Sequence, residues 1–581
     1  MSYKVAIRKD YYGKLKVDKD GNEVFEKCGR AVMINRVLNM IESNKIVLEL
    51  KFKYGFKERI CKVLRGEISD YNNVKRLADE GIDVDRKSAE VLYKCIMEQE
   101  EDFLNNESPV ITYNGLGWIK TDSIEYDGKL RWYYRASKII SDESFNDGVI
   151  YGMYLGNFKI DTMGTYKAWR EMVEEHVLPH TPLSIVLLCA LSSVTGALLA
   201  ERYPIGNGIL HLAGVSSSGK STSAYLAASI SGQPTTCAKS ETDADGNANV
   251  KSSLLQSFSA TGNALIGRLS GCCGVPIILD ELGKYDGKDM TSLVYNLFDG
   301  NGKARMNREL KVSEQEGFLG TVITIGEFSI FEKCKSKAEG LHNRVFEVKD
   351  RLTVSAKHSD IIKNVCTDNN GRAAPRLARH ILLSGGIGYV ESKYNQWKAM
   401  LMQVLPKVHF KEKFISTFAA LYLATAEIAQ EALELKFDTD AIIKYFINYL
   451  KTNTMNVSET SYAYLMEQFA VNSKKFYDFE SSNTIYGNSE IWGRYVNKKK
   501  VNADGRVVAG EYVVRQNVVN RLLKEGGFTK TQCVACWKEH NEIDYEKGHN
   551  TRSRIVEFGK PAEDVFVFYN FEHKEDNNHN E

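Results

Sequence analysis

The stretch His211-Leu-Ala-Gly-Val-Ser-Ser-Ser-Gly-Lys-Ser-Thr222 decides the fold of the centre of this chain. It fits the pattern G-x-x-x-x-G-K-[ST], in which two glycines, a lysine and a hydroxyl residue stand at fixed places. In such a loop the backbone N–H groups wrap phosphates, the lysine reaches the β- and γ-phosphates, and the hydroxyl holds Mg²⁺. We expect the following residues to bind ATP: Gly214, Val215, Ser216, Ser217, Ser218, Gly219, Lys220, Ser221 and Thr222.

The residues on either side of the loop favour this interpretation over a glycine turn that matches by chance. Gly208-Ile-Leu-His-Leu-Ala213 is typical of a short buried strand, and Ser221–Ile230 has the pattern of a helix. The N-terminus of that helix would point at the bound anion, where its N–H groups and dipole favour negative charge.

A second half of the nucleotide site is expected at Val275-Pro-Ile-Ile-Leu-Asp280-Glu281, which reads as a buried strand ending in two carboxylates. The carboxyl ends of parallel strands lie at one edge of a sheet, so both acids should lie beside the phosphate loop. We expect Asp280, with Ser221, to hold Mg²⁺ and Glu281 to polarise the attacking water. Because small-molecule kinases need no such base, the motifs indicate ATP hydrolysis.

Two further groups are candidates for catalysis. The next strand, Gly320–Glu327, carries Thr324 and Glu327 near its end, where either side chain could contact the γ-phosphate or orient the water. The alternative is that both only cap the strand. Arg344 stands just before another apolar strand, the place from which ring ATPases project an arginine into a neighbouring site. A lone arginine there can also be a surface charge.

Composition and charge narrow the class of protein. With 581 residues, 43% of them hydrophobic and 26% charged, the chain is typical of a globular protein of about three to five domains. A formal net charge of +1 provides no global attraction to nucleic acid or membrane, so any nucleic-acid surface must be local. Scattered cysteines and the lack of a visible secretory start predict a cytoplasmic protein. The apolar run Pro182–Ala200 is interpreted as a buried helix, so no membrane partner is expected.

Changes of pattern along the chain predict five regions. Residues 1–165 form an N-terminal α+β domain, and the alternating strands and helices of 166–395 form an α/β domain with a parallel sheet. Residues 396–480 are a helical connecting region, and 481–571 are a compact C-terminal domain. The polar residues 572–581 form a tail.

Three runs resemble a known family: Leu297-Phe-Asp-Gly-Asn-Gly-Lys-Ala-Arg305, Thr324-Ile-Gly-Glu327 and Asn370-Gly-Arg-Ala-Ala-Pro375. They are similar to the MCM-like AAA+ ATPases of mobile genetic elements, which include the replication helicases of staphylococcal cassette chromosomes and pathogenicity islands. The resemblance covers roughly residues 110–390. It implies the α/β fold of an AAA+ P-loop ATPase core and a homo-hexameric ring with ATP held between subunits.

The resemblance also implies roles for basic residues. Arg344 becomes an arginine finger that acts on the neighbouring subunit, and either Arg376 or Arg379 becomes a second sensor. Residues 301–313 take the place of a hairpin that enters the central channel and grips the phosphates of single-stranded DNA. Its cations are Lys303, Arg305, Arg308 and Lys311. Thr324 departs from the asparagine that common MCM proteins carry nearby, which leaves its water-orienting role open. The resemblance also suggests that residues 1–165 form a collar.

Residues 487–570 resemble a winged helix. We expect helices over Asn488–Val496, Gln516–Lys524 and Thr529–Glu539, the last being the recognition helix, and a wing over Arg552–Asn570. The residues expected to face the groove of duplex DNA are Lys530, Gln532 and Lys538. Many winged helices instead bind protein or only pack, so this alternative stays open.

The leading hypothesis from the sequence is an ATP-dependent hexameric DNA helicase and replication initiator of a mobile genetic element. It would translocate on single-stranded DNA and recognise an origin through the winged helix. One alternative is an AAA+ ATPase that remodels protein or acts as a nucleotide switch in defence. Another is a regulator that binds duplex DNA and keeps a vestigial ATP site, which the intact Lys220, Ser221, Asp280 and Glu281 disfavour.

Overall fold

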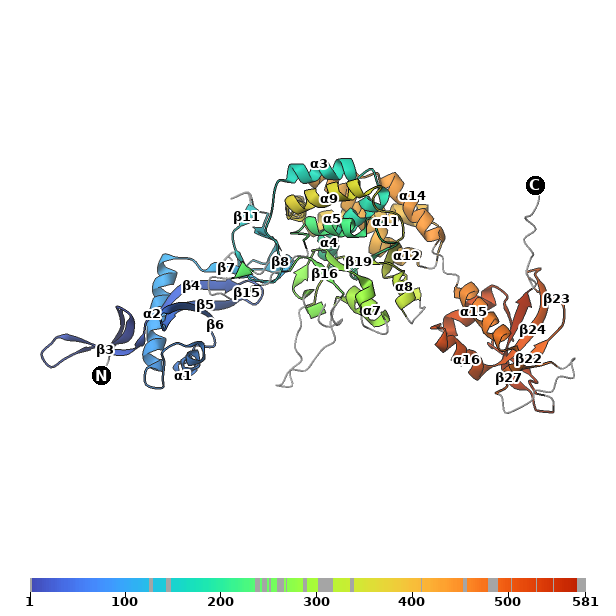
Figure 1. Cartoon of the computed structure of the whole chain (residues 1–581), viewed down its shortest axis with the longest axis horizontal. Coiled ribbons are helices and arrows are strands. Elements are labelled where there is room, and N and C mark those ends of the chain that lie inside the picture. Colours follow the sequence, from blue (N-terminus) through green and yellow to red (C-terminus); the bar gives the residue numbers. More distant parts are fainter. Residues whose placement is uncertain are drawn as a thin grey trace.

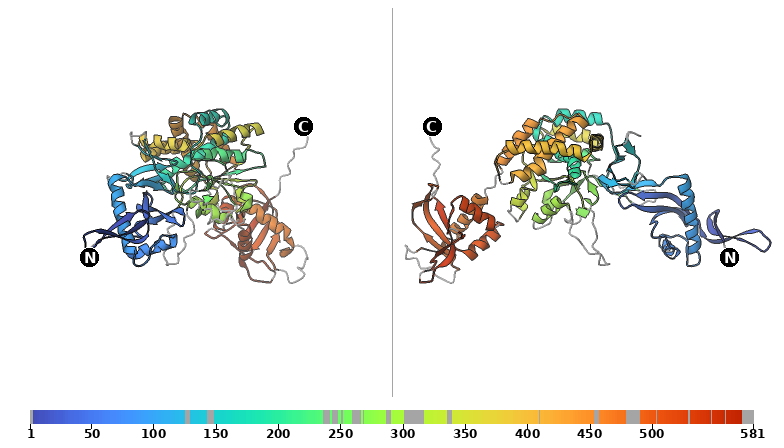
Figure 2. Two further views of the ribbon diagram at one scale, coloured as in Figure 1. Left: turned by 60° about the vertical axis from the view of Figure 1, so that its left-hand side comes forward. Right: turned by 180° about the vertical axis from the view of Figure 1, so that it is seen from behind.

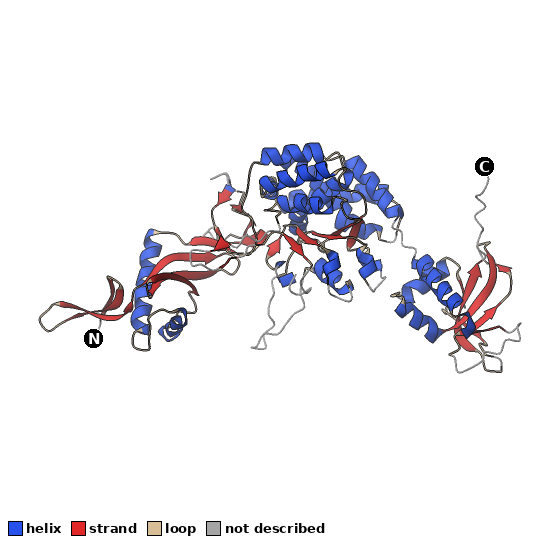
Figure 3. Cartoon of the chain, in the orientation of Figure 1, coloured by secondary structure: helices blue, strands red, loops and turns tan. Residues whose placement is uncertain are grey.

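A computed structural model of the chain describes residues 3–571 apart from a set of internal segments. The segments left out are 125–128, 143–147, 236–240, 243–247, 250–251, 259–265, 268, 286–289, 301–316, 335–338, 409, 453–456, 479–489, 503, 529, 547 and 558. A strand-rich N-terminal part, a central part rich in helices and a smaller C-terminal part follow one another along the long axis (Figure 1, Figure 2, Figure 3).

The N-terminal part is built from antiparallel hairpins and one long helix. Its strands are β1 (Lys4–Arg8), β2 (Tyr11–Val17), β3 (Glu23–Arg30), β4 (Val32–Met40), β5 (Lys45–Tyr54), β6 (Lys57–Leu64), β7 (Val110–Tyr113) and β12 (Met153–Tyr154). Strands β1 to β3 form one sheet, and the second sheet has the order β12-β7-β4-β5-β6. The short helix α1 (Tyr71–Val74) precedes α2 (Ala89–Asn106), whose apolar side chains, such as Val91 and Ile96, join the core with Leu48 and Leu50 of the second sheet.

A small third sheet joins the N-terminal part to the central part. Its order is β11-β10-β9-β8-β17, formed by β8 (Leu116–Thr121), β9 (Arg131–Arg135), β10 (Ile139–Ile140), β11 (Val149–Ile150) and β17 (Cys272–Cys273). Arg135 is 4% exposed and donates to Glu42 Oε1 at 2.7 Å and to the Gly271 carbonyl at 3.2 Å. Leu116 and Trp118 share one apolar core with the central helices. The segment that leads into the acidic strand is therefore held by residues of the N-terminal half.

The central part contains a five-stranded parallel sheet of order β16-β18-β19-β13-β20. Its strands are β13 (Ile209–Ala213), β16 (Leu255–Ser257), β18 (Ile277–Asp280), β19 (Val322–Gly326) and β20 (Val345–Val348). The helices around it are α3 (Tyr166–His176), α4 (Thr181–Leu199), α5 (Lys220–Ser229), α7 (Thr291–Asp299), α8 (Ile330–Lys333), α9 (Ala356–Asp368), α10 (Ala373–Leu383), α11 (Ile387–Val404), α12 (Lys411–Phe414), α13 (Ala420–Leu433) and α14 (Thr439–Thr452). Every residue of β13 and β19 is buried, as expected for a parallel sheet that is covered on both faces.

Helix α4 confirms the interpretation of the apolar run as a buried helix. Among the residues that the structure describes, it is the one helix long and apolar enough to cross a membrane, with a mean hydropathy of 2.0. Of its most apolar window, 94% is buried inside the protein. Its apolar surface is therefore covered by the sheet and by neighbouring helices.

The C-terminal part is a helix-turn-helix with a sheet. Its helices are α15 (Val457–Val471), α16 (Gln516–Glu525) and α17 (Lys530–Glu539), and its strands are β21 (Phe476–Asp478), β22 (Gly493–Val496), β23 (Lys500–Val501), β24 (Val507–Arg515), β25 (Ile543–Asp544), β26 (Arg552–Arg554) and β27 (Glu563–Phe571). The second and third predicted helices are confirmed as α16 and α17. The predicted first helix over Asn488–Val496 is wrong, because Gly493–Val496 pairs with β24 as a strand. Pairing in the sheet overrides the local pattern there, and α15 packs with the other two helices instead.

The contact between the N-terminal and central parts requires a glycine at position 117, which can be tested. Its φ is +80°, and an added Cβ would collide with the Cys273 carbonyl oxygen. Gly55 has a similar φ of +66° but open space around it. We expect Gly55→Ala to cost about 1 kcal/mol of unfolding free energy, from the left-handed backbone alone. Gly117→Ala should cost about 3 kcal/mol or more, because the collision adds to the backbone cost. Urea unfolding of both variants measures the difference, and equal losses would contradict the tight joint.

Candidate functional site

The loop between β13 and α5 has the shape that a phosphate-binding loop requires. Strand β13 ends at Ala213 and α5 begins at Lys220, so the loop lies at the carboxyl edge of the parallel sheet. Gly219 has a φ of +96°, and a Cβ there would approach Thr353 Oγ1 to 2.6 Å. Only glycine fits such a place without strain, which explains the second fixed glycine of the motif. The Leu352 N–H donates to the Ser218 carbonyl at 2.8 Å and so fixes the loop from the segment after β20.

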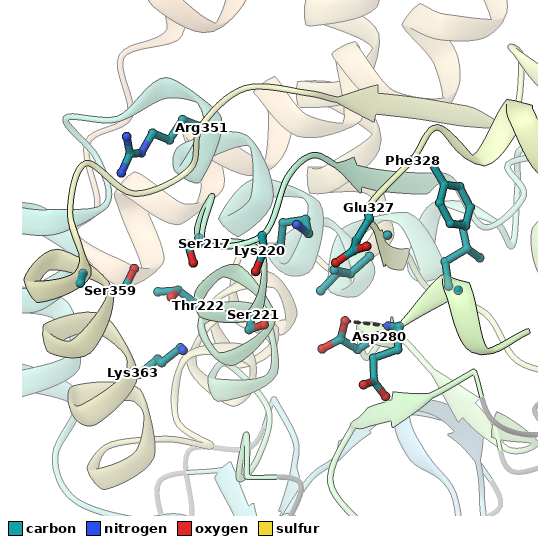
Figure 4. A pocket seen from close by; sticks show the side chains of 18 of the residues that line it. Ser217, Lys220, Ser221, Thr222, Asp280, Glu327, Phe328, Arg351, Ser359 and Lys363 are labelled. Atoms are coloured by element: carbon teal, nitrogen blue, oxygen red, sulfur yellow. Dashed lines mark hydrogen bonds between the residues drawn. The ribbon is translucent and has the colours of Figure 1, made fainter.

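A cavity of about 670 Å³ opens at this loop. Its wall includes Ser216, Ser217, Gly219, Lys220, Ser221, Thr222, Asp280, Glu281, Lys284, Glu327, Phe328, Arg351, Ser359, Asp360 and Lys363. These residues come from the phosphate loop and from the segments that follow β18, β19 and β20. In Figure 4, Asp280 and Glu327 lie on one side of Lys220, and Arg351, Ser359 and Lys363 lie on the other. The cavity has the volume of a small-molecule site and one acidic end.

Lys220 sits between the loop and the acids. Its Nζ donates to the carbonyls of Gly214 at 2.7 Å and Val215 at 2.8 Å. Burial lowers the pKa of Lys220, while the nearby carboxylates of Glu327 and Asp280 oppose that shift. A half-buried ammonium that donates to two loop carbonyls and, at 3.5 Å, to Ser218 Oγ is well placed to donate to phosphate oxygens as well.

Asp280 and Ser221 offer oxygen atoms to a cation. Burial raises the pKa of Asp280, and the Glu281 N–H, which donates to Asp280 Oδ1 at 2.7 Å, opposes this shift. The Ser221 side chain is exposed and lines the same cavity. Carboxylate and hydroxyl oxygens are the ligands that Mg²⁺ prefers, and Mg²⁺ commonly takes only one or two carboxylates together with substrate phosphates. The residues present therefore fit Mg²⁺ bound with a nucleotide.

Glu281 has an unusual backbone and a close partner. Its φ of 63° and ψ of 55° are left-handed, a conformation that costs free energy for a residue other than glycine. Lys284 Nζ lies 2.6 Å from Glu281 Oε2, and Ser257 Oγ donates to the same oxygen at 3.3 Å. About half of each charged side chain is exposed, at 49% for Glu281 and 57% for Lys284. One oxygen of this carboxylate thus accepts from two protein side chains.

The structure separates Thr324, which lies on β19, from Glu327, which directly follows that strand. Glu327 is exposed and lines the cavity, and it is close enough to Lys220 to oppose the lowering of the pKa of that lysine. Thr324 is fully buried and does not line the cavity. Its Oγ1 lies 2.8 Å from Nδ1 of His211 on the neighbouring strand. Of the two, Glu327 alone can face a nucleotide in this cavity.

Arg344 lies at the opposite edge of the sheet from the cavity. Its carbonyl accepts from the N–H of Ile209, the first residue of β13, whereas the phosphate loop follows the last residue of that strand. Its guanidinium lies 4.3 Å from the ring centroid of Tyr295 and 4.9 Å from that of Phe298. Arg344 therefore does not meet the cavity of its own chain.

The two candidates for a second sensor also lie outside the cavity wall. The Arg376 guanidinium lies 4.4 Å from the ring centroid of Tyr166, and Arg379 follows one turn later on α10. The choice between them stays open.

Arg351 and Lys363 line the cavity but were missed from the sequence. Arg351 follows the carboxyl end of β20 by three residues, and Lys363 shares one face of α9 with Ser359 and Asp360. Polar residues that follow a parallel strand lie at the same edge of the sheet as the phosphate loop. Extending this argument to the strand before Arg351 would have identified it from the sequence.

The predicted DNA-binding residues are described only in part. Lys303, Arg305, Arg308 and Lys311 and the side chain of Gln532 lie outside the described residues. Lys530 Nζ lies 5.5 Å from the ring centroid of Phe566. Lys538 Nζ donates to the His549 carbonyl at 2.8 Å and to Asn550 Oδ1 at 2.5 Å. Lys538 thus holds the segment after α17.

Comparisons with known proteins place the chain in a family. The model of a family described as "Domain of unknown function (DUF927)" matches residues 7–316, and that of the "Cch helix turn helix domain" matches 456–575. A solved structure described as "SCCmec type IV Cch - active helicase" has a TM-score of 0.69 at 21% identity, covering 98% of this chain and 97% of that chain. The resemblance to helicases of staphylococcal cassette chromosomes is thereby confirmed at the level of the fold.

Other comparisons add little. The A form of the apo NrS-1 C-terminal region has a TM-score of 0.20 at 9% identity, covering 72% of this chain and 90% of that chain, too low to inform the fold. No curated protein sequence matches significantly. The chain belongs to the DUF927 family, carries a Cch-type helix-turn-helix domain at its C-terminal end, and shares its fold with the SCCmec type IV Cch structure.

Proposed function

We propose that this chain is an ATP-driven DNA helicase and replication initiator of a mobile genetic element, a cytoplasmic homo-hexamer with an AAA+ core. The observation that carries the proposal is the cavity that gathers Lys220, Asp280, Glu281 and Glu327 at one edge of the parallel sheet. The likeness of the whole fold to a structure described as an active helicase supports the same conclusion.

In this proposal five residues share the steps of ATP hydrolysis. Lys220 holds the β- and γ-phosphates, and Ser221 and Asp280 hold Mg²⁺ against them. Bound Mg²⁺ would neutralise charge on the phosphates. Glu281 polarises the water once its carboxylate leaves Lys284, and Glu327 lies at the γ-phosphate end beside it.

Arg344 gives the reason for a ring. An arginine at the amino edge of the sheet cannot reach the cavity at the carboxyl edge of the same domain. Head-to-tail contact between copies would bring the two edges together, and such heterologous contacts form a ring when the rotation between copies closes. Arg344 then stabilises transition-state charge in the neighbouring site, a contribution worth about 10³–10⁵ in rate for arginine fingers of GTPases.

DNA would be engaged at two places. The basic segment 301–313 would grip single-stranded DNA in the channel, and the helix-turn-helix would contact duplex DNA through α17. For the second contact, Lys538 would have to exchange its partners at His549 and Asn550 for phosphates.

Stimulation by DNA separates a helicase from a protein remodeller that shares the same ATP site. We expect single-stranded DNA to raise ATP hydrolysis by the full chain, and Lys303→Ala/Arg305→Ala to abolish that rise and unwinding while basal hydrolysis stays. Glu281→Gln, which should hydrolyse nothing, controls for contaminating ATPases. Unwinding that persists in the double variant would contradict the proposal that Lys303 and Arg305 bind single-stranded DNA. A hydrolysis rate that does not change with DNA would favour the protein remodeller.

The ion pair of Lys284 with Glu281 predicts a rate effect. An exposed pair of this kind is worth about 0.2–1 kcal/mol, so releasing the base should raise basal kcat by up to about fivefold. We expect Lys284→Met to show this rise with little change in KM for ATP. A raised KM would show instead that Lys284 binds phosphate, and a lowered kcat would show that it helps Glu281.

Mixing two inactive variants tests whether Arg344 acts between copies. Glu281→Gln and Arg344→Ala should each be inactive alone. When mixed, a site that takes Glu281 from one variant and Arg344 from the other is complete. Random mixing should restore about a quarter of the wild-type rate, because one junction in four is then complete. If the two variants co-assemble and the mixture does not hydrolyse ATP, Arg344 does not act on the site of a neighbouring copy.

A further inference from the structure

A row of three buried polar side chains crosses the central sheet behind the cavity. Thr324 on β19 pairs in register with His211 on β13, and His211 pairs with Glu347 on β20. Thr324 and His211 are 0% exposed and Glu347 is 4% exposed, among strands that are otherwise largely apolar. Burying polar groups costs free energy unless each is hydrogen-bonded, so such a row calls for a reason other than packing.

The hydrogen bonds of His211 fix where its proton lies. Nε2 lies 3.0 Å from the Phe328 carbonyl oxygen, which can only accept, so Nε2 carries the hydrogen. In the neutral ring Nδ1 is then an acceptor, and it lies 2.8 Å from Thr324 Oγ1. The Thr324 hydroxyl must therefore donate to His211. Burial lowers the pKa of His211, which favours this neutral ring.

Glu347 holds the next residues of the same segment. Its Oε1 accepts from the Ile330 N–H at 3.0 Å, and its Oε2 accepts from the Ser329 hydroxyl at 3.0 Å. Lys349 Nζ lies 2.9 Å from Oε2 and balances the buried charge. These bonds fix the start of α8, whose first residue, Ile330, lies three residues beyond Glu327.

The two sets of bonds act on one short segment. Residues 328–330 are fastened to β13 through His211 and to β20 through Glu347, while the side chain of Glu327, just before them, faces the cavity. A carboxylate on a loop is placed well only when its supports are themselves locked by packing and hydrogen bonds. The row thus holds the strand end that presents Glu327 to Lys220.

We propose that His211, Thr324 and Glu347 are positioning residues that set the placement of Glu327 at the γ-phosphate end of the site. The proposal rests on the proposed ATP hydrolysis, and it gives Thr324 a different task from the one expected from the sequence. A threonine hydroxyl has one hydrogen, and Thr324 donates it in a hydrogen bond to His211. Thr324 therefore acts through His211 and Phe328 rather than on water or phosphate.

Two substitutions of Thr324 separate hydrogen bonding from packing. Thr324→Val keeps the shape and removes the hydroxyl, whereas Thr324→Ser keeps the hydroxyl and removes a methyl group. We expect Thr324→Val to lower kcat about tenfold with KM for ATP within about twofold of wild type, since a small misplacement costs rate more than binding. Thr324→Ser should keep at least about half of the wild-type kcat. A purely packing role for Thr324 predicts the reverse order, which would overturn the proposal.

Hydrogen exchange in the full-length protein tests the positioning without relying on hydrolysis. The peptide covering residues 326–333 should exchange faster in Thr324→Val than in wild type, and Thr324→Ser should match wild type. Equal exchange in all three proteins would overturn the proposal. If the wild type does not hydrolyse ATP, the proposed function fails while the exchange result still decides the positioning. If the wild type hydrolyses ATP and both variants have the wild-type kcat, only the proposed positioning role is contradicted.

Discussion

The parallel pairing of β18, β19 and β13 is the constraint on which the site depends. It brings the ends of three strands, far apart in the sequence, to one edge of a sheet, so Asp280, Glu327 and the phosphate loop share one cavity. The same pairing sends Arg344, which precedes a strand, to the opposite edge. In the proposed mechanism, Arg344 therefore acts on the site of a second copy.

The parts of the site that could be predicted from the sequence are those fixed by local rules. The spacing of Gly214, Gly219 and Lys220 specifies a loop whose backbone shape admits few other residues, and the structure has that loop between a strand and a helix. Asp280 and Glu281 stand at the end of an apolar run. Because parallel strands end at the same edge of a sheet, this was enough to place both acids beside the phosphate loop. Helix α16 carries a strong helical pattern, and the bounds of both α16 and α17 were predicted to within a residue.

The parts that could not be predicted depend on contacts between distant segments. A position near the end of a strand does not determine which side chain faces the cavity. The Thr324 side chain does not face it and instead forms a hydrogen bond with His211 on the neighbouring strand. Arg351 and Lys363 belong to no short motif, and only folding brings them to the phosphate loop. Gly493–Val496 is a strand because β24 offers it a partner, which no local pattern reveals.

Electron cryo-microscopy of the full chain with a non-hydrolysed ATP analogue, Mg²⁺ and forked DNA tests the central claim most directly. We expect a closed ring in which each triphosphate lies against Lys220, Asp280 and Glu327 of one copy and contacts Arg344 of the next. A monomer whose nucleotide site is complete within one chain, or a ring in which Arg344 lies far from every nucleotide, would contradict the account.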